Sequence, residues 1–206
     1  MRKYRLSFSA ASLALAESIK VAEVYDQVKN WIETREILIQ NNILQSRTIS
    51  RGKRLAHELI TRLSNFSDDQ VSAFLDCDLD EQKLLLWFIL CKTYPYIGEF
   101  AVDVLHQKFL VFDMVFNDYD YNAFFLTKLD EHEELERITE STRKKMQSTI
   151  LLMMRQADLL TTQNQIIRVL PTSRLAQILE PDSALAYHIY PAFPEEFEKL
   201  LWMFRV

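Results

Sequence analysis

Apolar residues recur along most of the chain at intervals of three or four, which is the spacing of an amphipathic helix. Segments with this pattern include 12–30, 31–41, 50–66 and 141–160. Further helical segments are predicted from 67, at 80–94, at 98–116, from 120, at 133–139, after 172 and from 194 to 206. Only two residues are glycine, the residue that most readily adopts the positive φ angles of tight hairpin turns, so few such turns are expected. The pattern therefore predicts an all-α, globular, multi-helix fold.

Residues 166–170 are the one strand-like stretch, ending at Pro171. This stretch follows two predicted helices, 133–139 and 141–160, which is the order of a winged helix with a minimal wing. A full wing needs two strands, and only one is visible in the sequence. We therefore expect an N-terminal helical region over 1–118 and a winged-helix-like region over 119–206, packed together as one compact unit.

Two of the predicted helices open with hydroxyl residues and a group of basic residues. The first basic cluster comprises Arg47, Thr48, Ser50, Arg51, Lys53 and Arg54. The second basic cluster comprises Ser141, Thr142, Arg143, Lys144 and Lys145, with Ser148 and Arg155 further along the same helix. In each case a preceding helix and a short connection give the plan of a helix-turn-helix element.

Cations at a helix N-terminus are unfavourable for the helix itself, because that end already carries the positive end of the helix dipole. Free backbone N–H groups at the same end bind anions, and nucleic-acid phosphate is the obvious candidate. We therefore predict that both clusters bind double-stranded DNA, mainly through phosphate and with weak sequence preference. The alternative for each cluster is a solvated cationic surface on a helix that belongs to the core.

The net charge of −5 excludes a globally basic nucleic-acid binder, although the basic and acidic residues are segregated along the chain. Cys77 and Cys91 are too few and too far apart for a disulfide framework and suit a reducing compartment. The longest apolar run, 84–91, is too short for a membrane span, which needs about 20 residues. The N-terminal segment lacks the apolar core of a signal peptide. We expect a cytoplasmic protein that does not enter a membrane.

No catalytic pattern is present in the sequence. Two isolated glycines cannot form a phosphate-binding loop, and the four histidines are scattered. The acidic stretch 130–134 is better explained as a solvated turn than as a metal site. The sequence therefore predicts a protein that is not an enzyme and that carries no cofactor and no metal.

Several short segments stand out in their order along the chain: 3–8, 44–48, 85–87, 91–94, 100–105 and 141–143. In this order they resemble the BrxA family, the small core proteins of bacteriophage-exclusion (BREX) phage-defence systems. The resemblance runs from the N-terminus to about Leu160. It implies an all-helical monomer with two helix-turn-helix elements flanked by positive residues, binding DNA in a bacterial defence system with other BREX components as possible partners. The family's basic helix openings correspond to Arg47, Arg51, Lys53 and Arg54, and to Arg143, Lys144 and Lys145.

A second function remains open from the sequence, which is that of a protein-interaction adaptor or scaffold within the defence complex. In that case the basic clusters meet an acidic surface on a partner protein. Aromatic residues of the C-terminal tail would then be exposed and dock on another subunit; they are Phe193, Phe197, Trp202 and Phe204.

Overall fold

Polar side chains begin most of the longer helices, because they accept hydrogen bonds from backbone N–H groups that the helix leaves free. Asn30, Thr48 and Ser67 do this for three successive helices, and Asp78 for the central one. In the computed structural model, which describes residues 3–202, the chain is all-α as predicted, and no strand occurs among these residues. The elements are η1 (Ser7–Ala10), α1 (Leu15–Val28), α2 (Trp31–Gln40), α3 (Ile49–Leu63), α4 (Asp68–Asp76), α5 (Leu79–Thr93), α6 (Pro95–Phe100), the π-helix η2 (Ala101–His106), α7 (Gln107–Leu110), α8 (Asp118–Leu129), α9 (Glu133–Glu136), α10 (Glu140–Gln156), α11 (Ser173–Leu179), η3 (Glu180–Asp182), α12 (Ser183–Ala186) and α13 (Pro194–Trp202).

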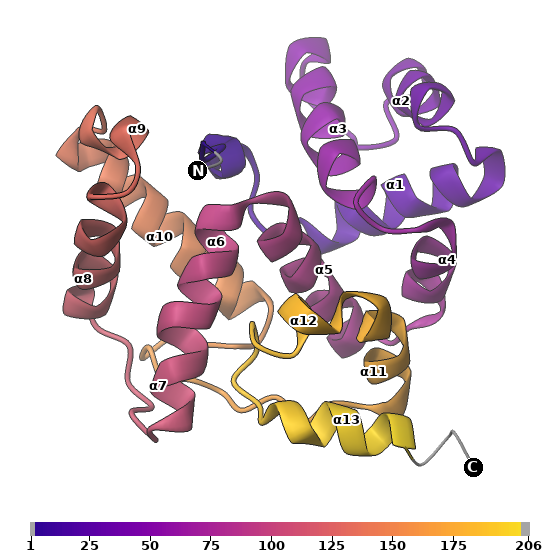
Figure 1. Ribbon diagram of the computed structural model, residues 1–206. Helices are drawn as coiled ribbons and strands as arrows, with labels where there is room; N and C mark the ends of the chain where they lie inside the picture. The colour runs from indigo at the N-terminus through magenta and orange to yellow at the C-terminus, as the bar shows by residue number, and fades with distance from the viewer. Residues whose placement is uncertain (1–2, 203–206) are drawn as a thin grey trace.

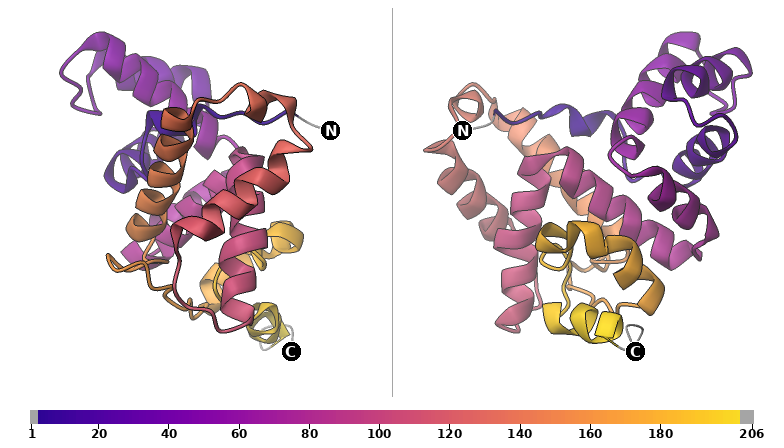
Figure 2. Two further views of the ribbon diagram at one scale, coloured as in Figure 1. Left: turned by 90° about the vertical axis from the view of Figure 1, so that its left-hand side faces the viewer. Right: turned by 45° about the vertical axis from the view of Figure 1, so that its right-hand side comes forward.

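The helices form three groups around α5 and α6 (Figures 1 and 2). Helices α1 to α4 lie at one end of the molecule, α8 to α10 lie at the other, and α11 to α13 pack beside α5. The N-terminal segment 4–13, called the strap below, runs from α9 to the start of α1. Tyr4 of the strap stacks on His132 beside α9, and the Leu13 N–H donates to Gln156 of α10 over 2.9 Å. Both contacts lie in the α8–α10 group, and Arg62 of α3 donates to carbonyl oxygens of the strap, so the strap connects the two ends of the molecule.

The apolar run 84–91 lies at the centre of the protein, as its length predicted. Trp87 is fully buried in α5, and its indole N–H donates to the Ile189 carbonyl oxygen over 3.0 Å. One continuous apolar core includes residues of both predicted regions, 1–118 and 119–206, whose division itself stays a prediction. Among the described helices, none combines the length and the apolar character that crossing a bilayer requires.

Several elements differ from the sequence prediction in their bounds or type. The helix expected over 98–116 begins at Pro95 and ends at Leu110, because Phe112 takes a left-handed backbone conformation with φ of 59°. The helix expected over 12–30 is shortened to α1 by left-handed residues on both sides, Ala14 and Lys29. The strand and minimal wing expected at 166–170 are absent from the described residues. That segment makes only isolated antiparallel bridges, from Gln165 to Val115 and from Ile166 to Leu160.

A buried ion pair fastens the strap to α3 and α5. The Arg62 side chain of α3 is almost fully buried and donates to Glu58 one turn earlier over 2.8 Å. Its two remaining nitrogens donate to the carbonyl oxygens of Ser12 and Ala11, over 2.6 and 3.0 Å. The Tyr94 hydroxyl donates to the same Glu58 carboxylate, and burial together with this bond raises the pKa of Tyr94 to about 12. The Arg62–Glu58 pair therefore joins three parts of the chain, because Arg62 binds the strap and Glu58 binds Tyr94.

Gly98 is required where α6 passes the end of α5. A Cβ atom at this position would lie 2.8 Å from the backbone oxygen of Cys91, which is held inside the core. Overpacking typically costs about 1–3 kcal/mol, and a backbone obstacle places Gly98→Ala near the upper end. The better helix propensity of alanine offsets only about 1 kcal/mol of this loss of stability. We expect Gly98→Ala to lower the free energy of unfolding by about 2 kcal/mol in urea titrations followed by circular dichroism.

Gly52→Ala is the matched control for that measurement. Its Cβ would meet the Ser46 Cβ at 3.3 Å, in a surface connection that can move. Equal losses of stability for the two variants would contradict the close contact at Gly98.

Candidate nucleic-acid interface

The first basic cluster surrounds the N-terminal end of α3. The Thr48 hydroxyl caps this helix by accepting from the Arg51 N–H over 3.2 Å, so the predicted hydroxyl residue does begin the helix. Helices α2 and α3 pack against each other, but the connection between them spans 41–48. That is longer than the turn of roughly three or four residues in a helix-turn-helix motif. The helix-turn-helix assignment of this element therefore stays a prediction.

The cations of the first basic cluster are exposed and have no partner among the described residues. Arg47, Arg51, Lys53 and Arg54 lie within about two turns of one helix start, and Ser50 is exposed beside them. Within residues 3–202 none of the four side chains forms an ion pair or a side-chain hydrogen bond. The first turn of α3 contains no acid that would complement the helix dipole. The end of α3 therefore combines free positive charge with the free N–H groups of a helix start.

Three neighbouring cavities lie around this end of α3. The first, of about 400 Å³, lies between the α3 side chains of Arg51 and Arg54 and residues 11–17 of the strap and α1. A second of about 330 Å³ is lined by Arg47 and Arg51, and a third of about 350 Å³ by Arg47 and Lys53. Because the same cations line adjoining cavities, they surround a concave surface that an anion can enter.

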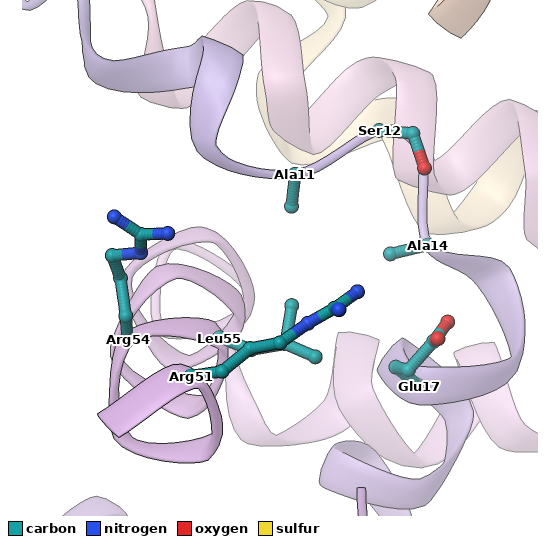
Figure 3. Close-up of a pocket in the computed structure, with 7 residues that line it drawn as sticks. All are labelled: Ala11, Ser12, Ala14, Glu17, Arg51, Arg54 and Leu55. Carbon is teal, nitrogen blue, oxygen red and sulfur yellow. The ribbon is translucent and has the colours of Figure 1, made fainter. Parts of the chain in front are cut away.

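Figure 3 shows the first cavity from the side of α3. Arg51 extends across the cavity toward Glu17, which belongs to the first turn of α1. Arg54 projects from another side of α3, and Leu55 lies behind Arg51. Glu17 and Ser12 were not predicted as site residues, since no local pattern marks them and only the folded chain brings them to α3.

The second basic cluster differs at its helix start. The cap is Thr139, whose hydroxyl accepts from the Thr142 N–H over 3.3 Å, and α10 begins at Glu140. Glu140 was expected in the preceding turn. As the first residue of the helix, it pairs with Lys144 over 2.8 Å, and this bond holds the pKa of the Glu140 carboxyl below its usual range. The charge of Lys144 is therefore partly compensated within the protein.

Other members of the second basic cluster also have internal contacts. Arg143 is half-buried with its guanidinium 5.4 Å from the centre of the Phe125 ring. Arg155 donates to the Asn164 side chain over 2.6 Å, and the Ser148 hydroxyl donates to the Lys144 carbonyl oxygen over 2.9 Å. Ser141 and Thr142 hydrogen-bond through their hydroxyls to Thr139. The Lys145 side chain is exposed and has no partner among residues 3–202.

The C-terminal aromatic residues do not form one exposed surface. Phe197 is fully buried, where it stacks on Tyr187, so its predicted exposure was wrong. Phe193 is half-buried beside Phe109, whereas Trp202 is 73% exposed. Phe204 lies outside the described residues. The described part of the chain also contains no group of three His, Cys, Asp or Glu side chains placed to hold a metal ion.

Comparison with known proteins identifies the family of this chain. The BrxA family model matches residues 2–183. The BREX protein BrxA of Bacillus cereus (strain H3081.97) is 25% identical over 160 residues, which cover 78% of this chain and 80% of that protein. The fold is similar to the crystal structure of an uncharacterized protein from Magnetospirillum magneticum, with a TM-score of 0.80 and 16% identity over 92% of this chain and 100% of that chain. The chain belongs to the BrxA family.

Proposed function

We propose that this chain is a non-catalytic DNA-binding accessory protein of a BREX phage-defence system. The relative from Bacillus cereus is named as a BREX protein, and the family model covers most of the chain. The observation that carries the DNA-binding part is the group of four exposed, unpartnered cations at the capped start of α3. No acid lies in that first helical turn, so the free charge and the helix dipole act in the same direction on an approaching anion.

In the proposed mechanism the backbone of duplex DNA enters the concave surface around α3. The N–H groups of the first turn and the hydroxyls of Thr48 and Ser50 bind phosphate oxygens, while Arg47 and Arg51 displace counterions from the duplex. Lys53 and Arg54 contribute in the same way from the next turn. Contacts of this kind position a protein on DNA and do not distinguish bases, so we propose weak sequence preference.

The second basic cluster has a smaller part in this proposal. Lys144 already pairs with Glu140, and Arg155 already donates to Asn164, so a phosphate would have to replace these partners. Only Lys145 and the exposed part of the Arg143 side chain remain available in this cluster to bind DNA phosphate. We therefore propose that the first cluster supplies most of the affinity.

Fluorescence anisotropy with a labelled duplex of random sequence, titrated at several salt concentrations, tests this function. We expect binding that weakens steeply as salt rises, because each phosphate contact releases counterions. A signal that does not change with protein concentration, even at low salt, would contradict DNA binding.

The alternative function, an adaptor within the defence complex, is favoured by one group of side chains. Val111, Phe112 and Val115 are large and exposed in the segment that joins α7 to α8, and Tyr119 is exposed in the first turn of α8. A helical protein in water rarely gathers several exposed apolar side chains without a partner. Co-purification from the native host after nuclease treatment separates the two functions, since a partner that stays bound without DNA and is lost in Phe112→Ser supports the adaptor.

A further inference from the structure

One acidic side chain shares the concave surface with the arginines. Glu17 lines both the first and the second cavity, and Arg51 and Leu55 line the same two. The third cavity contains no acid among its lining residues. Glu17 is therefore the single carboxylate among the described residues that line the three cavities.

The place of Glu17 is determined by α1. The residue before this helix, Ala14, has a left-handed backbone and offers no side-chain cap, so the first N–H groups of α1 are left without one. A carboxylate in the first turn complements them and the helix dipole. Glu17 is half-buried there and lines the cavity that Arg51 enters from α3 (Figure 3).

Arg51 extends toward Glu17 without forming an ion pair with it. Among residues 3–202, neither side chain has an ion pair or a side-chain hydrogen bond. An anion that approaches Arg51 therefore meets a positive charge without a partner, together with a negative charge on the opposite wall. Two like charges in a partly enclosed surface repel each other more than they do in open water.

We propose that Glu17 opposes the phosphate that Arg51 attracts and so limits the affinity of the first basic cluster for DNA. This inference rests on the proposed DNA binding. Because the carboxylate repels the same phosphate that Arg51 attracts, it lowers affinity without removing a contact. The result is a protein that meets DNA through a strongly positive surface and yet releases it readily.

The test is Glu17→Gln, measured by the same anisotropy titration. Neutralising the carboxylate is expected to tighten binding by up to about five-fold at low salt, which is the scale of a single exposed charge pair. The gain should shrink as salt rises, because screening weakens the repulsion. In an Arg51→Gln background, Glu17→Gln should give a much smaller gain, since the two charges act on the same phosphate.

Glu23→Gln is the matched control. Glu23 is an exposed acid on the same helix that lines none of the three cavities, so its variant changes net charge equally. Equal gains from both variants would overturn the inference and assign the effect to net charge alone. Unchanged or weaker binding of Glu17→Gln, with normal helical circular dichroism, would overturn it as well. Absence of binding by the unaltered protein would instead contradict the proposed function itself.

Discussion

Arg62→Ala is expected to lower the free energy of unfolding by about 3–5 kcal/mol, the usual cost of breaking a buried ion pair from one side. Without Arg62, the Glu58 carboxylate stays buried with only the Tyr94 hydroxyl beside it. The carbonyl oxygens of Ala11 and Ser12 lose their donor in the same step. Urea unfolding followed by circular dichroism and tryptophan fluorescence measures the loss.

The double variant Glu58→Gln with Arg62→Met is the control for that experiment. It removes both charges and keeps most of the volume, and replacing a whole buried pair by apolar or neutral groups often costs little. We expect it to be clearly more stable than Arg62→Ala. A loss below about 1 kcal/mol for Arg62→Ala would contradict the buried ion pair and its bonds to the strap.

Reversing charge in the first basic cluster, with Arg51→Glu and Arg54→Glu together, is expected to abolish DNA binding. Each substitution removes a counterion-releasing contact and adds a repulsive charge beside the remaining ones. Both side chains are exposed, so the fold should be unaffected. Anisotropy measures the binding, and helical circular dichroism measures the fold.

Two comparisons accompany that double reversal. Lys144→Glu with Lys145→Glu should cost less affinity, because Lys144 is already paired with Glu140. Arg137→Glu with Lys199→Glu changes net charge equally at exposed positions outside both clusters and should cost least. Equal losses for all three double variants would mean that overall charge, and not the surface around α3, determines binding.

The sequence predicted local features of the fold well. The hydroxyl of Thr48 at the start of α3 and the apolar spacing along that helix are local signals, and both correspond to the structure. Left-handed backbone at Ala14 and Phe112 was not predictable, because glycine or asparagine usually marks such positions. The prediction therefore placed the C-terminal end of the helix over 98–116 six residues too late.

Long-range contacts account for what the sequence did not predict at the candidate site. On a helical wheel Arg62 lies at the border of the polar side, yet it is buried, because the strap brings two carbonyl oxygens to it. Glu17 reaches the arginines in the same way, through the packing of α1 beside α3. Lys144 forms an ion pair that the sequence did not predict. The pair is possible because α10 begins one residue earlier than expected and so contains Glu140.

The most direct test of phosphate binding at the start of α3 is the slope of log affinity against log salt for the unaltered protein and for Arg51→Gln. The slope is about −0.9 for each phosphate contact on duplex DNA, so the four cations of the first basic cluster contribute roughly −3.5, and contacts from the second cluster add to it. Losing Arg51 should make the slope less steep by about one unit. The same slope for both proteins would contradict a phosphate contact at Arg51 and with it the proposed interface.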